Sequence, residues 1–353
     1  MKFGIFDYVD FRDEPLSKTY DDRMKLLHAA EAAGFYSYHV TEHHATPLSG
    51  TPSPTVFLAA VARETKKLRF GALLFLLPLY HPLRLLEELY MLDNLSGGRL
   101  DIGVGKGVSP FEFAALGVDL KQSEEMYDEA FAILHEGLTR DRLNYKGKRY
   151  QFNNVPMVMK SVQQPHPPLW YGLRGGPSGS LLPARYGMNV VTLGTDDKAE
   201  QAIARFRQAW VEYAPERKII GSPVVDPIIG VVRGIVIADT DAEAERIARP
   251  AYQHWFDNVC WLWRDNNAYP TIPLSEDYDE SCRTGTMVVG SPETVRRVLL
   301  AQAKKCKHNY LVLKLAFGSL THAQEMRTLE LFRTEVMPAL QQEAPNELAT
   351  DIV

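Results

Sequence analysis

A carboxylate and two imidazoles stand side by side at Glu42, His43 and His44. Residues 35–41 before them are rich in strand-forming side chains, and the prolines and glycine that follow indicate a loop. The unperturbed pKa of histidine is about 6.5, so it can give or take a proton near neutral pH. Catalytic groups of α/β barrels lie where a strand runs into a loop. We therefore expect one of these histidines to face the mouth of such a barrel as a general base.

The same three residues do not predict a metal site. Imidazole and carboxylate are common metal ligands. Adjacent residues on a strand point to opposite sides, however, so the triplet cannot supply three ligands to one ion. The other histidines show no ligand-pair spacing. We expect no metal centre, and the alternative to catalysis is a histidine pair that is satisfied within the core.

Two glycine-rich segments follow predicted strands and are candidates for ligand binding. Residues 103–107 contain three glycines and Lys106, and either a planar or anionic ligand or a tight strand exit would explain them. Residues 172–180 lead into a helix, whose exposed amides favour a phosphate. The polar side chains of this second segment are Arg174, Ser178 and Ser180. Its alternative is a flexible loop with an N-cap serine.

Strand patterns and helix patterns alternate along the whole chain. The almost wholly apolar run 68–77 is typical of a parallel strand that is buried on both faces. Eight strands are expected, at residues 2–7, 35–41, 68–77, 100–104, 169–172, 189–193, 228–238 and 310–316. The main helices between and after them are expected at 20–33, 54–64, 82–95, 123–138, 180–186, 196–213, 240–255 and 322–337. This count favours a single α/β domain over residues 1–353, a closed (β/α)8 TIM barrel, over an open sheet.

Two insertions interrupt the alternation. Residues 143–166 are expected to form a hairpin or an extended excursion. Residues 258–292, between the seventh and eighth strands, combine tryptophans, prolines and acidic residues, and a loop of that length is unusual unless it is a lid or disordered. We expect a mobile lid there, and the alternative for its aromatic residues is a dimer surface. Ser291 and Pro292 then predict the start of a further helix.

Composition excludes several classes of protein. The chain has 353 residues, of which 45% are hydrophobic and 24% charged, as in ordinary globular proteins. The net charge is −5 with scattered basic residues, which argues against nucleic acid or an anionic membrane as partner. No apolar run approaches the ~20 residues that span a bilayer, and the start shows no signal-peptide pattern. Three widely spaced cysteines predict reduced thiols, so we expect a cytoplasmic protein.

Short motifs along nearly the whole chain together resemble the bacterial luciferase-like flavin-dependent monooxygenases. They are Met1–Gly4, Thr41–His44, Leu77–Pro78, His81–Pro82, Leu92–Arg99, Gly103–Gly107 and Gly290–Val295. Each is weak alone, but their order and spacing are specific. The resemblance implies a TIM barrel with a mobile insertion before the last strand. It also implies a homodimer, as in many relatives.

The resemblance implies a two-component enzyme. Reduced FMN would come from a separate NAD(P)H:flavin reductase and react with O2 to a flavin 4a-hydroperoxide. That species would oxygenate a small organic substrate such as an aldehyde or ketone. The protein would shield it from water and place the substrate beside it. We expect no light emission.

The resemblance also implies roles for particular residues. His43 matches the catalytic histidine, which manages a proton at the flavin, and Glu42 and His44 are its supporting neighbours. Leu73 and Leu74 match the place of a non-prolyl cis peptide under the flavin ring. The cofactor contacts implied are Ala72, Leu73, Leu74, Lys106, Arg174, Gly176, Ser178, Gly179 and Ser180. The substrate pocket is expected among the 258–292 lid and Tyr8, Phe11, Phe111 and Phe113.

The chain departs from the family pattern around the flavin phosphate. Lys106 stands where a luciferase has arginine and lacks the forked geometry of a guanidinium. Glu124 stands where an arginine would meet the phosphate, which a carboxylate repels. Gly176 and Gly179 replace hydroxyl residues, leaving serines and Arg174 as substitutes. These changes affect the phosphate contacts and not the barrel.

Two other functions remain open at this point. One is a deazaflavin-dependent oxidoreductase on the same barrel, which passes a hydride without oxygen. The other is a non-catalytic flavin-binding accessory subunit. The presence of His43 and His44 favours an enzyme.

Overall fold

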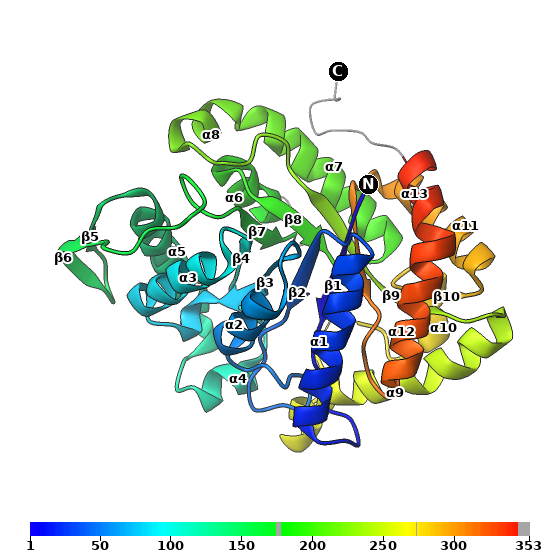
Figure 1. The fold of residues 1–353 in the computed structure, drawn as a ribbon. Coiled ribbons are helices and arrows are strands. Elements are labelled where there is room, and N and C mark those ends of the chain that lie inside the picture. The colour runs from blue at the N-terminus through cyan, green and yellow to red at the C-terminus, as the bar shows by residue number, and fades with distance from the viewer. Residues whose placement is uncertain (174–177, 273, 345–353) are drawn as a thin grey trace.

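Eight parallel strands close into a barrel (Figure 1). The computed structural model describes residues 1–173, 178–272 and 274–344, and the side chain of Ser178 is outside the description. The barrel strands are β1 (Lys2–Asp7), β2 (Ser37–Val40), β3 (Arg69–Leu76), β4 (Leu100–Gly105), β7 (Leu169–Gly172), β8 (Asn189–Thr192), β9 (Ile229–Ile237) and β11 (Tyr310–Lys314). Because β1 pairs with β2 and β11, and β9 pairs with β8 and β11, no edge is left in the ring. The predicted (β/α)8 barrel is confirmed.

Helices form the outer layer around these strands (Figure 1). The longer ones are α1 (Leu16–Ala32), α2 (Pro54–Glu64), α3 (Pro82–Ser96), α5 (Ser123–Thr139), α6 (Ser178–Tyr186), α7 (Asp196–Glu212), α9 (Asp241–Asp265), α11 (Pro292–Cys306) and α12 (His322–Leu331). Shorter ones are α4 (Pro110–Ala115), α8 (Ala214–Ile220), α10 (Tyr278–Arg283), α13 (Met337–Glu343), two 3-10 turns at Leu77–Leu79 and Leu120–Gln122, and a π segment at Phe332–Val336. Helix α11 begins as expected, with the Ser291 side chain accepting a hydrogen bond from the amide of Thr294.

The first insertion, expected at residues 143–166 as a hairpin or an extended excursion, forms a hairpin. Strand β5 (Arg142–Lys146) pairs antiparallel with β6 (Gln151–Pro156), and the pair projects from one side of the barrel (Figure 1).

The second insertion holds more regular structure than expected. Helix α9 does not end near residue 255 but continues to Asp265, because buried side chains keep recurring at helical spacing, among them Phe256, Val259 and Trp263. The insertion also contains α10 and a short strand β10 (Met287–Gly290), which pairs parallel with the end of β9. Among the described residues of the insertion, irregular chain is confined mainly to 266–272 and 274–277. The mobility expected of this segment stays a prediction.

Large side chains fill the interior of the barrel. The rings of His39, Trp170 and Tyr310 contact one another, with the His39 and Trp170 centroids 5.1 Å apart, and His39 Nε2 lies 2.9 Å from the Tyr310 hydroxyl. All three are fully buried. Gly4 leaves space for Tyr310, since a Cβ there would overlap its hydroxyl. The three rings form a packed layer, as in other barrels of this class.

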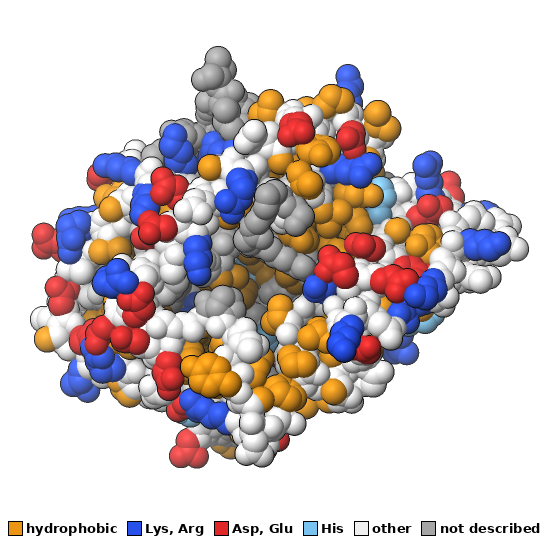
Figure 2. Space-filling model, turned by 180° about the vertical axis from the view of Figure 1, so that it is seen from behind, with side chains coloured by type: hydrophobic (Ala, Val, Ile, Leu, Met, Phe, Trp, Pro, Cys, Tyr) orange, Lys and Arg blue, Asp and Glu red, His pale blue; other side chains and the backbone are white. Residues whose placement is uncertain are grey.

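The surface shows two further features. Across the described residues, no helix combines the length and the apolarity needed to cross a membrane. Seen from behind, the molecule is hollowed near its centre, with hydrophobic side chains inside the hollow and charges of both signs scattered around it (Figure 2).

The buried histidines predict how stability depends on pH. Burial lowers the pKa of His39 and of His308 to about 3, whereas a histidine in an unfolded chain titrates near 6.5. Between these two values the unfolded chain binds more protons, so stability falls as the pH falls through that window. We expect the free energy of unfolding to drop by about 2 kcal/mol per histidine between pH 7 and pH 5. Urea unfolding at the two pH values measures this.

Histidine variants test whether the buried histidines cause this pH dependence of stability. His39→Gln should remove one histidine's share of the pH dependence, and His28→Gln, at an exposed position, is the matched control. An unchanged pH dependence in the His39→Gln variant would contradict the assignment.

Candidate active site

Three loops at the carboxyl ends of neighbouring strands converge on His43. Its Nδ1 lies 3.0 Å from Glu112 Oε1, and its ring stacks on Tyr8 with the centroids 5.8 Å apart. Tyr8 follows β1, His43 follows β2, and Glu112 belongs to α4 after β4. The His43 side chain is 24% exposed and that of Glu112 only 5%. An imidazole that can be reached from outside is therefore held from behind by a buried carboxylate.

The contact with Glu112 fixes the proton on one nitrogen of His43. An ionised carboxylate only accepts hydrogen bonds, so Nδ1 donates and Nε2 is left as the acceptor. Nε2 is thus the atom that can take a proton from a bound molecule, and Glu112 stabilises the imidazolium that results. The stacked Tyr8 ring limits the rotation of the imidazole.

Glu42 and His44 form a second hydrogen-bonded pair near this contact. Glu42 is buried, its Oε1 lies 2.9 Å from His44 Nε2, and its Oε2 accepts from the Leu76 amide at 3.1 Å and the Tyr80 hydroxyl at 2.8 Å. Burial pulls the pKa of His44 down, but the hydrogen bond and charge of Glu42 outweigh it and raise that pKa. Glu42 therefore supports His44 and joins this loop to the end of β3. The direct partner of His43 is Glu112.

Sequence reasoning named Phe111 and Phe113 but missed Glu112 between them. The local signal is weak: Ser109 caps α4, its hydroxyl accepting from the amide of Glu112 at 3.4 Å. An acidic residue three places after an N-cap serine is common at helix starts and does not indicate a contact with a distant histidine.

The residues expected around the substrate lie in different places. Tyr8 lies against His43, and the Phe111 ring packs 5.7 Å from that of Trp263 near the end of α9. Phe113 is buried beneath Gly107, and Phe11 is 40% exposed. The insertion after β9 therefore reaches the loop that carries Glu112.

The expected flavin-ring contacts lie on β3, where it passes β4. The Leu73–Leu74 peptide is cis, as the family resemblance implied, and the pairing of β3 with β4 shifts register between Ala72 and Phe75. A Cβ on Gly105 would lie 2.6 Å from Leu74 Cδ1, and one on Gly103 would overlap the carbonyl of Ala72. Gly103 and Gly105 thus allow the close packing of β4 against β3, which neither explanation for residues 103–107 anticipated.

This packing predicts that an added methyl group lowers stability more at Gly105 than at Gly172, although both glycines face Leu74. Gly105→Ala places a methyl group against Leu74 Cδ1, so it should lower the free energy of unfolding by about 1–3 kcal/mol. Gly172→Ala is the matched control, because its Cβ would lie 3.3 Å from the same Cδ1 atom. Equal stability of the two variants in urea unfolding would show that Leu74 is not held as described.

The expected phosphate contacts are only partly described. Lys106 lies at the end of β4 and forms a 2.6 Å ion pair with Glu124. Ser180 in the first turn of α6 is buried, and its Oγ has no hydrogen-bond partner among the described residues. Gly179 beside it is also buried. Arg174 and Gly176 lie outside the described residues.

These donors fit an anionic group. A buried hydroxyl without a partner and the amides of a helix N-terminus suit a phosphate. Lys106 adds a positive charge, but it shares that charge with Glu124. Among the described residues no group of three or more histidine, cysteine or acidic side chains is arranged to hold a metal ion.

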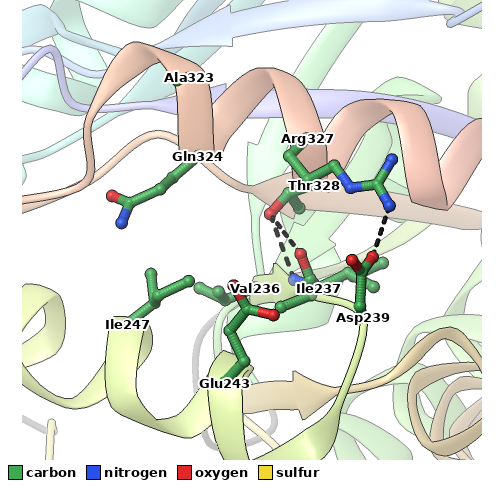
Figure 3. Close-up of a pocket in the computed structure, with 10 residues that line it drawn as sticks. Val236, Ile237, Asp239, Glu243, Ile247, Ala323, Gln324, Arg327 and Thr328 are labelled. Atoms are coloured by element: carbon green, nitrogen blue, oxygen red, sulfur yellow. Dashed lines mark hydrogen bonds and ion pairs between the residues drawn. The ribbon is translucent and has the colours of Figure 1, made fainter.

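A separate pocket of about 180 Å³ lies outside the barrel, between the end of β9, α9 and α12 (Figure 3). Arg327 pairs with Asp239 at its edge, and the Thr328 hydroxyl bonds the backbone of Ile237. None of the residues of the candidate site lines it.

The family model described as luciferase-like monooxygenase matches residues 1–305. The chain belongs to this family. The resemblance drawn from the motifs is confirmed.

Relatives extend the comparison over the whole chain. The uncharacterized protein y4wF of Sinorhizobium fredii (strain NBRC 101917 / NGR234) is 36% identical over 96% of both chains. The oxygenase component of the flavin-dependent trigonelline monooxygenase of Acinetobacter baylyi is 25% identical over 96% of this chain and 95% of its own.

Solved structures share the fold. The monooxygenase RslO1 from Streptomyces bottropensis has a TM-score of 0.85 at 23% identity, covering 96% of this chain and 99% of its own. The oxygenating constituent of 3,6-diketocamphane monooxygenase of Pseudomonas putida, in complex with FMN, has a TM-score of 0.77 at 21% identity, covering 96% and 98%. An F420-dependent secondary alcohol dehydrogenase has a TM-score of 0.72 at 17% identity, covering 96% and 98%.

Proposed function

We propose that the chain is the oxygenase component of a two-component flavin-dependent monooxygenase. It would use reduced FMN and O2 to oxygenate a small organic substrate, such as an aldehyde or ketone, without light emission. A separate NAD(P)H:flavin reductase would deliver the reduced flavin. The observation that carries the proposal is the His43–Glu112 pair in the mouth of a luciferase-like barrel. The monooxygenase relative from Acinetobacter baylyi and the FMN complex of the Pseudomonas putida protein support the choice of chemistry and cofactor.

The chain's own residues supply binding and proton transfer. Bound reduced FMN would supply the electrons with which oxygen is activated. Ala72, Leu73 and Leu74 on β3 would contact the flavin ring, with Ser180 and Lys106 toward the phosphate. His43 would hold or move a proton at Nε2, while Glu112 keeps its Nδ1 protonated. The apolar surroundings of Tyr8 exclude water from the same region.

The second candidate is a deazaflavin-dependent oxidoreductase. An F420-dependent dehydrogenase shares the barrel, and an imidazole with a carboxylate behind it could equally move a proton during hydride transfer. Formation of an oxygenated product distinguishes the two. With FMN and a flavin reductase, the first function consumes oxygen and yields an oxygenated product, whereas the second oxidises or reduces F420 without oxygen.

The role of His43 predicts a separation of turnover from binding. His43→Ala should lower the rate of oxygenated-product formation by about 10²–10⁴-fold, since that is the usual contribution of a general acid or base. The affinity for FMN should change by no more than about threefold, which corresponds to under 1 kcal/mol of binding free energy. Mass spectrometry on a panel of aldehydes and ketones measures the product, and flavin fluorescence measures binding.

The exposed His28 provides the control, as His28→Ala should behave like the original chain. Undiminished product formation by His43→Ala would remove the proposed role. Loss of FMN binding in that variant would make His43 a binding residue instead.

A further inference from the structure

A lysine lies inside the barrel mouth without a hydrogen-bond or ion-pair partner in the part of the chain that the structure describes. Lys314 is the last residue of β11 and is only 6% exposed. Its Nζ lies 3.1 Å from the ring centroid of Trp255 and 4.7 Å from that of Phe317. A Cβ on Gly234 of the adjacent strand β9 would lie 3.3 Å from Lys314 Cε, so the side chain lies along the inner face of β9. Among the described residues, Nζ has no hydrogen bond or ion pair, only these ring contacts.

Such a position is unfavourable for an amine. A buried ammonium without an anionic partner loses its hydration, and a cation–π contact offsets that loss only in part. Burial accordingly lowers the pKa of Lys314 to about 7. Methionine, of similar length, would pack against Trp255 and Phe317 without this penalty. Perturbed buried amines in a cleft are typical of functional sites.

The carboxylate of Asp10 does not serve as the partner. Asp10 influences Lys314 through its charge but forms no ion pair with it. Its Oδ2 instead accepts from the Gly318 amide at 2.8 Å, and burial raises the pKa of Asp10, which weakens it as a counter-ion. The place for an anion beside Lys314 is thus left to a molecule that enters the mouth.

Lys314 belongs to the same mouth as the candidate catalytic residues. The Trp255 ring that it covers lies 5.9 Å from the ring of Tyr8, and Tyr8 stacks on His43 at 5.8 Å. Two aromatic rings therefore separate the amine from the imidazole.

We propose that Lys314 binds the carboxylate of the substrate, so that the substrate class is small organic acids with an apolar body. A single buried charge matches a monoanionic carboxylate better than a phosphate dianion, which needs several donors. The aromatic rings between Lys314 and His43 suit the apolar body. The reacting aldehyde or ketone end would lie toward His43, and that part of the assignment rests on the proposed function, whereas the carboxylate contact does not.

Calorimetric titration of the full chain without flavin tests the contact. The probes are benzoate against benzamide and hexanoate against hexanamide, which differ within each pair mainly in charge. At least one carboxylate should bind about tenfold or more tightly than its amide, since tenfold corresponds to about 1.4 kcal/mol. Lys314→Met should abolish this preference. Lys148→Met, at an exposed lysine, should keep it.

Two results would overturn the proposal: no preference for either carboxylate, or a preference that survives in Lys314→Met. If that variant does not fold, as judged by thermal unfolding, Lys314→Gln takes its place with the same expectations. The outcome is independent of the flavin chemistry. A chain that consumes no oxygen with FMN would still show the carboxylate preference, and a chain that oxygenates neutral aldehydes without that preference would refute only the role of Lys314.

Discussion

The hydrogen bond between Glu112 and His43 is the constraint on which the rest of the site depends. It joins residues 69 positions apart, and it exists because β2, β3 and β4 are neighbours in a parallel barrel whose carboxyl ends open on one side. A buried carboxylate gives the imidazole one tautomer and one orientation. Without the Glu112 carboxylate, nothing would distinguish His43 from the other histidines around the mouth.

A buried ion-pair network joins the two ends of the ring. The fully buried Arg23 of α1 pairs with Asp7 of β1 at 2.7 Å and with Glu325 of α12 at 2.9 Å, which joins the first and last units of the ring. Removing one member of such a network would leave an uncompensated charge and would cost about 3–5 kcal/mol. Separately, Glu42 joins the loop after β2 to the end of β3. Glu42 thus fixes the loop that carries His43 against the next strand.

Short sequence patterns predicted most of the helices and strands, but they did not predict the contacts between loops. Helix α2 and strand β7 have the bounds expected, because Pro54 suits a first helical turn and prolines precede Leu169. The end of α9 was placed about ten residues early, because its aromatic residues read equally well as a loop surface. The sequence did not indicate the contact of Glu112 with His43 or of Lys314 with Trp255, because the two residues of each pair are far apart along the chain. The family resemblance did locate the cis peptide at Leu73–Leu74.

We propose that flavin binds in the mouth beside His43. A crystal structure of the chain with FMN tests it most directly. The account predicts the isoalloxazine ring against β3 at Ala72–Leu74, within contact of the His43 imidazole, with the phosphate toward Ser180. A flavin bound elsewhere, or an imidazole turned away from it with the Glu112 contact broken, would contradict the account.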